Sequence, residues 1–202
     1  FTVTVADKTI AHPYLGQGSP KGYLINGEEA ETRGMDVEMQ GNVGALDWNI
    51  GYALNDTNLS EDLYTPASVP VLYAGKGAQL PGSPERTVNI GVAYTHYFNS
   101  GVGLAQRIDY YSQSETRNYI GESSKYDTNF DGFRLINMSS TFFKDKTYVS
   151  IFMKNITNER GVTGAFLNPA FGPNPSQGFY GSNNREFYAL PRTLGISINR
   201  TF

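Results

Sequence analysis

The last eleven residues, Arg192-Thr-Leu-Gly-Ile-Ser-Ile-Asn-Arg-Thr-Phe202, alternate apolar and polar side chains and stop on an aromatic residue. Successive side chains of a β-strand point to opposite faces, so Leu194, Ile196 and Ile198 share one face and the intervening polar residues lie on the other. The stretch therefore predicts a strand with one apolar and one polar face. Such a strand is typical of a half-buried sheet or of a membrane β-barrel, and how often the pattern recurs decides between them.

The alternation recurs along the whole chain. We expect strands at about residues 1–10, 22–40, 46–55, 87–95, 102–110, 136–142, 149–154 and 192–202. No helical periodicity is sustained over about twelve residues, and no apolar run approaches the roughly 18 residues of a membrane helix. The sequence therefore predicts an all-β chain of about eight strands, with residues 1–202 in one domain.

The two faces of these strands differ in side-chain size. Large residues such as Met35, Val37 and Met39 occupy one face, whereas the other face carries mostly Gly, Ala, Ser, Thr and Asn. A soluble sandwich needs an apolar core and a freely charged outer face. Small polar residues suit a hydrated barrel interior, and large apolar residues suit lipid. The pattern predicts a transmembrane antiparallel β-barrel.

Three residues break this alternation. Gln106 interrupts the apolar face of its strand, and Phe152 lies on a polar face. Arg200 has the lipid-facing parity, but it lies near a strand end, where its long stem can carry the charge to the headgroups.

Short and long connections alternate between the predicted strands. Residues 41–44, 99–101 and 144–146 fit tight turns, whereas 56–84, 113–130 and 159–187 are long and rich in Gly, Pro, Asn, Ser and aromatic residues. Bacterial outer-membrane barrels have short periplasmic turns and long external loops. The sequence therefore predicts a multi-pass protein of the outer membrane of a Gram-negative bacterium, with lipid as its surroundings.

Composition excludes several other functions. The chain has no Cys, which excludes disulfides, thiol catalysis and Cys-based zinc sites, and its net charge of −3 does not favour nucleic acid as a partner. The two histidines, His12 and His96, lie beside no recognisable nucleophile, so we predict no enzyme and no catalytic residue. We also predict no cofactor.

Two acidic stretches are interpreted as hydrated surface rather than as metal sites. Glu28, Glu29 and Glu31 form one stretch. In the other, Asp127, Asn129 and Asp131 alternate like calcium ligands but lack the Gly and Glu of a complete calcium loop.

Four stretches, in order, resemble the TonB-dependent outer-membrane receptors. An Arg-Gly pair precedes an alternating acidic and apolar strand in 27–39, and prolines mark the start of a strand in 80–91. Residues 150–158 resemble the Asn-Leu-Thr/Asp signature of the penultimate strand, and 191–202 resemble the closing strand. Each motif is weak alone, but four in order are specific.

The resemblance implies a barrel of about 22 strands closed around an N-terminal plug. It implies active import of a scarce ligand, such as a siderophore, cobalamin or an oligosaccharide, with energy from the TonB complex acting through the plug. Neither a plug nor a TonB box is recognised in these residues, so we expect the chain to be the C-terminal portion of such a barrel. Two alternatives stay open, a stand-alone eight-stranded outer-membrane barrel with a structural or adhesive role and a soluble β-sandwich binding module.

Recognition residues are expected on the long loops, because loops on a rigid scaffold commonly carry binding sites. The loop at 159–187 mixes aromatic rings with amides and Arg, which suits stacking on a sugar or an aromatic chelate. The candidate ligand-binding residues are Phe166, Phe171, Phe179, Tyr180, Asn184 and Arg185. The alternative is that these aromatics pack the loop onto its neighbours. Arg107 and Asp109, two apart on the polar face, are expected to pair across strands as wall structure.

Overall fold

The computed structural model describes residues 2–5, 23–26, 29–64, 70–118, 120, 129–166 and 185–202. Its strands are β1 (Thr2–Val5), β2 (Tyr23–Asn26), β3 (Ala30–Val43), β4 (Leu46–Leu59), β5 (Leu63–Tyr64), β6 (Leu72–Ala74), β7 (Arg86–Tyr97), β8 (Gly103–Gln113), β9 (Thr116–Arg117), β10 (Asn129–Phe130), β11 (Phe133–Lys144), β12 (Thr147–Lys154), β13 (Val162–Phe166), β14 (Arg185–Tyr188) and β15 (Thr193–Arg200). These described residues contain no helix with the length and apolar character needed to cross a membrane.

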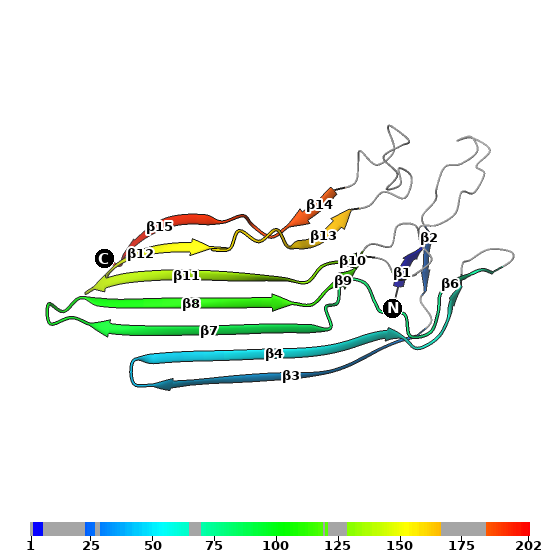
Figure 1. The fold of residues 1–202 in the computed structure, drawn as a ribbon, viewed down its shortest axis with the longest axis horizontal. Coiled ribbons are helices and arrows are strands. Elements are labelled where there is room, and N and C mark those ends of the chain that lie inside the picture. The colour runs from blue at the N-terminus through cyan, green and yellow to red at the C-terminus, as the bar shows by residue number, and fades with distance from the viewer. Residues whose placement is uncertain are drawn as a thin grey trace.

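The main element is a seven-stranded antiparallel sheet in the order β15-β12-β11-β8-β7-β4-β3 (Figure 1). The strands predicted at 46–55, 87–95, 102–110, 136–142, 149–154 and 192–202 are β4, β7, β8, β11, β12 and β15. The all-β, antiparallel prediction is confirmed. Within the described residues the sheet is open, with β3 and β15 as its edges, so the barrel does not close in this chain.

The N-terminal part differs from the prediction. The strand expected over 22–40 is described as β2 and β3, and β1 pairs with β2 in a separate two-stranded sheet. The main sheet therefore has seven described strands where about eight were predicted. Leu24 and Ile25 are adjacent apolar residues, so this segment lacks the strict alternation that distinguishes β3 and β4.

Tight connections join three pairs of strands at one end of the sheet, at the left of Figure 1. The turn predicted at 41–44 lies at 44–45, because β3 continues to Val43. Val43 pairs with Leu46 and Lys144 with Thr147, so these two hairpins have two-residue turns, whereas five residues connect Tyr97 to Gly103. Gly44 and Asp145 adopt positive φ angles of 62° and 51°, as such turns require. The two-stranded pairs β5–β6, β9–β10 and β13–β14 arise from the long connections, at the long-loop end.

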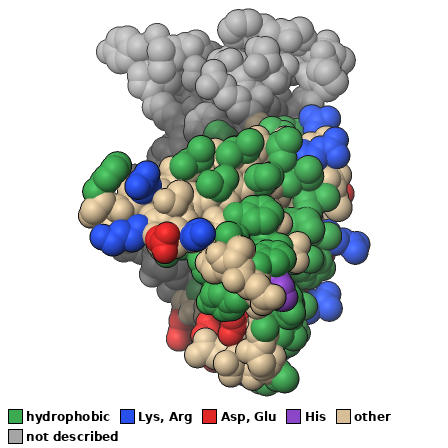
Figure 2. Space-filling model, turned by 90° about the vertical axis from the view of Figure 1, so that its left-hand side faces the viewer, with side chains coloured by type: hydrophobic (Ala, Val, Ile, Leu, Met, Phe, Trp, Pro, Cys, Tyr) green, Lys and Arg blue, Asp and Glu red, His purple; other side chains and the backbone are tan. Residues whose placement is uncertain are grey.

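One face of the sheet exposes large apolar side chains. Met39, Ile50 and Ile90 are aligned across three strands, and Met39 is 51% exposed. Figure 2, seen from the turn end, shows a broad band of hydrophobic side chains with Lys and Arg at its margins. Other exposed members of this apolar face are Met35, Val37, Leu54, Val92, Tyr94, Ile108, Met138, Phe142, Ile151, Leu194, Ile196 and Ile198. Such a surface suits lipid rather than water.

Phe152, which breaks the alternation, has a structural reason for its position. It pairs with Gly195 of β15, and its ring lies where a side chain on that glycine would stand. Phe143 covers Gly103 in the same way on β8. An aromatic ring over a cross-strand glycine protects backbone that would otherwise be bare. The polar face therefore accepts these two rings.

A small apolar core lies at the end of β4, where the long connection after that strand folds back on it. Leu59, Leu63, Tyr73, Ala74 and Ile120 are buried together. The amide of Leu59 donates to the Ala78 carbonyl at 2.9 Å, and the Gly77 amide donates to the Leu59 carbonyl at 2.8 Å. These contacts give the long-loop end an ordered frame.

Candidate functional site

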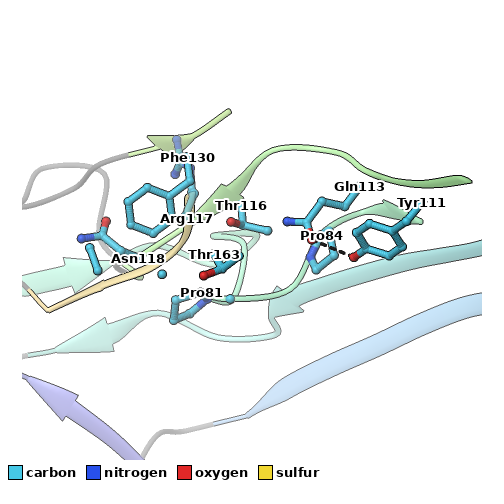
Figure 3. Close-up of a pocket in the computed structure, with 12 residues that line it drawn as sticks. Pro81, Pro84, Tyr111, Gln113, Thr116, Arg117, Asn118, Phe130 and Thr163 are labelled. Carbon is cyan, nitrogen blue, oxygen red and sulfur yellow. Dashed lines mark hydrogen bonds between the residues drawn. The ribbon is translucent and has the colours of Figure 1, made fainter. Parts of the chain in front are cut away.

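A recess of about 420 Å³ lies on the polar side of the sheet at the long-loop end (Figure 3). Its walls come from β8, the segment before β7, the β9–β10 pair and β13. The lining residues are Pro81, Gly82, Pro84, Tyr111, Gln113, Thr116, Arg117, Asn118, Phe130, Thr163, Gly164 and Ala165. We call it the outer recess.

Strand β8 of the main sheet forms one wall of the outer recess. Tyr111 and Gln113 have the polar-face parity, and Gln113 is the last residue of the strand. The Tyr111 hydroxyl donates a hydrogen bond to Gln113 Oε1 at 2.8 Å, drawn as a dashed line in Figure 3. This bond orients both side chains at the long-loop end of the sheet and leaves the Gln113 amide nitrogen available as a donor.

The segment that precedes β7 forms a second wall. Pro81 and Pro84 have fixed φ angles, and Gly82 adopts a φ of 76° that favours glycine. The Gly82 amide donates to the Arg117 carbonyl at 2.8 Å, which ties this segment to β9. The proline motif that precedes β7 therefore forms part of the recess.

The third wall combines β10 and β13. Phe130 pairs with Thr116 in the β9–β10 register, and both are 7% exposed. The Thr163 hydroxyl donates to the Phe187 carbonyl at 3.1 Å, which joins β13 to β14. The recess thus combines an aromatic ring, hydroxyls, amides and a guanidinium, a mixture that suits a ligand with flat apolar surfaces and a polar periphery.

A small charged cluster lies where β14 meets the residue segment that leads into β13. The Arg160 guanidinium carbon lies 5.2 Å from the centre of the Tyr188 ring, and the Tyr188 hydroxyl donates a hydrogen bond to Glu186. That hydrogen bond, with smaller contributions from desolvation and the Glu186 charge, raises the pKa of the Tyr188 phenol.

Only two of the six candidate residues predicted from sequence, Phe166 and Arg185, are among the described residues. Phe171, Phe179, Tyr180 and Asn184 lie outside the described residues. Phe166 and Arg185 face each other in the last backbone pair of the β13–β14 ladder. The described part of the long loop that does line the recess is its stem, at Thr163, Gly164 and Ala165.

Sequence reasoning missed Tyr111, Gln113 and Phe130. The strand parity of Tyr111 and Gln113 and the proline motif were visible, but nothing local in the sequence brings β8 and β10 together with β13. Arg107 and Asp109, expected to pair across strands, instead pair with each other along β8, with Nε at 2.9 Å from both carboxylate oxygens. Across the residues that the structure describes, no three His, Asp or Glu side chains converge on a possible metal site.

Comparisons with known proteins agree with this architecture. The family model described as TonB dependent receptor-like, beta-barrel, matches residues 3–158. The crystal structure of the siderophore receptor PiuA from Acinetobacter baumannii is similar in fold, with a TM-score of 0.61 and 12% sequence identity. The match covers 85% of this chain and 22% of that receptor, so the chain spans about a fifth of its length. No curated protein gives a significant match. The chain belongs to the TonB-dependent receptor-like β-barrel family.

Proposed function

We propose that this protein is a TonB-dependent outer-membrane receptor that binds a scarce ligand at the outer recess and imports it actively. Family membership supports a receptor or transporter role. The observation that carries the more specific proposal is the recess itself, a polar and aromatic cavity where the long connections meet. The family consists of receptors and transporters rather than enzymes, and we propose no reaction.

The ligand classes that fit are a siderophore, cobalamin or an oligosaccharide. Each offers a ring or planar face together with several hydrogen-bonding groups. Phe130 and the two prolines offer apolar surface, while Gln113 and Arg117 offer polar groups. We propose that the connection from β13 to β14 adds further contacts to the ligand, through Phe166 at the end of β13, Arg185 at the start of β14, and Phe171, Phe179, Tyr180 and Asn184 between them.

The proposed placement is multi-pass in a Gram-negative outer membrane, with the tight turns on the periplasmic side. The exposed apolar face then meets lipid, and the polar face meets the hydrated interior. In a complete receptor of this kind, that interior would hold a plug that communicates with the TonB complex. The Arg107–Asp109 pair would line this interior as part of the wall.

The two alternatives fit less well. A stand-alone eight-stranded barrel needs a closed sheet, whereas the described sheet has seven strands and two free edges. A soluble sandwich needs a second sheet on the apolar face, and none of the described strands packs there, since residues such as Ile196 and Ile198 are 69% and 72% exposed.

Uptake measurements test the proposal. Cells with and without the gene are given a radiolabelled ferric siderophore, cobalamin or oligosaccharide as the limiting source, and uptake is measured with and without functional TonB. We expect one class whose uptake needs both the gene and TonB. If the protein is in the outer membrane but uptake of every class is independent of the gene, the proposal is wrong.

Substitutions in the recess should weaken ligand binding. Gln113→Ala removes an amide and Arg117→Gln removes a positive charge from the cavity lining. We expect either change to raise the Kd for the imported ligand about 10-fold, because a hydrogen bond to a charged or polar ligand group is worth about 1–2 kcal/mol. The matched control is Thr95→Ala, on the same face near the tight turns, which should leave the Kd unchanged. Titration of the detergent-purified protein, followed by tryptophan fluorescence, gives these values. Unchanged affinity in both recess variants would place the ligand elsewhere.

A further inference from the structure

Two arginines lie at the margin of the apolar face, on the side of the long-loop end. Arg86 shares its face with Val88 and Ile90 on β7, and Arg134 shares the same face with Ile136 on β11. Each stands two residues beyond the last aliphatic side chain of its strand, which is about 7 Å along the strand. Both side chains are exposed.

The two arginines flank one strand and its serines. Ser112 of β8 is aligned with Arg134 on one side and with Val88 on the other. The Arg86 amide donates to Ser114 Oγ at 3.1 Å, and the Ser114 amide donates to the Arg86 carbonyl at 2.9 Å. The backbones that carry Arg86 and Arg134 are therefore held on either side of β8, about 10 Å apart across the strands and offset by two residues, about 7 Å, along them.

No carboxylate on β7, β8 or β11 balances these charges on the same face. The nearest one is Asp56 on β4, two residues beyond the partner of Arg86; it accepts a hydrogen bond from Asn58 and is aligned with Arg33. The apolar-face positions of β7, β8 and β11 carry no Asp or Glu; they are Arg86, Val88, Ile90, Val92, Tyr94, His96, Leu104, Gln106, Ile108, Tyr110, Ser112, Arg134, Ile136, Met138, Ser140, Phe142 and Lys144. Within the described part of the chain, neither guanidinium forms a side-chain hydrogen bond or ion pair.

Arg33 shows the contrasting arrangement on the same face. It lies on β3 beyond Met35, and its Nε is 2.8 Å from Glu31 Oε1. Its charge is therefore neutralised by a neighbour on its own strand. Arg86 and Arg134 have no acidic neighbour two residues away on their own strands, so the two guanidinium groups lie at the border between apolar surface and water without such a partner.

We propose that Arg86 and Arg134, with the Ser112 hydroxyl between them, bind the phosphate-bearing headgroup of a lipid in the outer leaflet. Arginine forms charge-assisted hydrogen bonds with phosphate, often in pairs. Ile90, Tyr110 and Ile136 are aligned as the next row toward the tight turns, where they offer apolar surface to the acyl chains. A lipid would bind through both the two charges and this apolar row, whereas free phosphate would bind through the charges alone and therefore more weakly. The inference rests on the proposed membrane placement, but not on import.

Native mass spectrometry of the polypeptide purified from outer membranes in mild detergent tests the site. The probes are lipopolysaccharide, dephosphorylated lipopolysaccharide and inorganic phosphate. We expect wild-type protein to retain the phosphorylated lipid, and the double variant Arg86→Gln/Arg134→Gln to retain it at least about 10-fold less, because each surface cation contributes appreciably to anionic-lipid binding. The dephosphorylated lipid should bind both proteins weakly and equally.

Arg33→Gln is the matched control, because it removes a cation from the same face that Glu31 already neutralises. It should retain the lipid as the wild type does, and equal heat-modifiability on gels checks that all variants fold. The inference is wrong if the double variant retains as much lipid, if Arg33→Gln loses as much, if dephosphorylated lipid is retained equally well, or if inorganic phosphate displaces the lipid. A protein that imports its ligand but retains no phosphorylated lipid contradicts the lipid site alone, whereas absence from outer membranes contradicts the placement on which both proposals depend.

Discussion

Replacing Asn155 by Ala is expected to lower the free energy of unfolding by about 3–5 kcal/mol. The residue is 3% exposed and follows β12 directly. Its Nδ2 donates to the carbonyls of Glu159 at 2.9 Å and Leu190 at 2.8 Å, while its Oδ1 accepts from the Glu159 amide at 2.9 Å. Alanine would leave three backbone groups without these partners, at about 1–3 kcal/mol each if they stay buried.

The backbone of Asn155 adds to this cost. Its φ of 48° lies in the left-handed region, which Asn tolerates better than Ala. Asn155→Gly separates the two effects, because glycine accepts this φ but makes none of the side-chain bonds. We expect the glycine variant to recover a part of the loss, roughly 1 kcal/mol.

Urea unfolding in detergent, followed by the fluorescence of Trp48, measures these differences. The matched control is Asn42→Ala, at an exposed position on β3, which should change stability by less than about 0.5 kcal/mol. A loss below about 1 kcal/mol for Asn155→Ala would show that its hydrogen bonds are readily replaced by water.

The hydrogen bonds of Asn155 give a structural reason for a motif seen in the sequence. Asn155-Ile-Thr-Asn158 resembles a receptor signature, and the structure gives each Asn a structural role. The backbone N–H of Asn155 donates to Asn137 Oδ1 at 2.9 Å, and the backbone N–H of Arg192 donates to Asn158 Oδ1 at 3.0 Å. The motif therefore connects β11 and β12 to the residues that lead into β15.

The strands of the main sheet were predictable because their pattern is local. Side-chain alternation has a period of two, so Leu46–Leu54 reveals both the strand and its apolar face without knowledge of any partner. The β1–β2 pair was harder to predict, since a pairing partner is not encoded in one strand. Phe152 was an exception in the sequence because its reason, Gly195, lies on another strand.

The outer recess could not be predicted for a related reason. Its walls come from positions such as Pro81, Tyr111, Phe130 and Thr163, which are far apart in the chain. Only the order of strands in the sheet brings them together. From the sequence we expect recognition at the long-loop end, where the recess also lies, but composition points to the aromatic-rich loop rather than to the end of β8.

Replacing Gly34 by Ala is expected to destabilise the protein by about 1–3 kcal/mol, the usual cost of forcing a group into occupied space. Gly34 follows Arg33 in the motif that precedes the alternating part of β3, and it pairs with Asn55 of β4. A Cβ at Gly34 would overlap the carbonyl oxygen of Leu54 and lie 2.9 Å from Asn55 Oδ1. The carbonyl is backbone, so relief requires the strands to move apart.

Gly51→Ala is the matched control and should have the opposite sign. Gly51 lies on β4, its added Cβ would be 3.7 Å from the Asn89 Cβ, and its φ is not positive. The added methyl group makes an ordinary van der Waals contact in the folded protein. Alanine also makes the unfolded chain less flexible than glycine does, so we expect stability to rise by about 0.4–1 kcal/mol. The same urea titration measures both variants. Stabilisation by both alanines would mean that β3 can shift away from Leu54, and the Arg-Gly motif would then need a reason other than close packing of the two backbones.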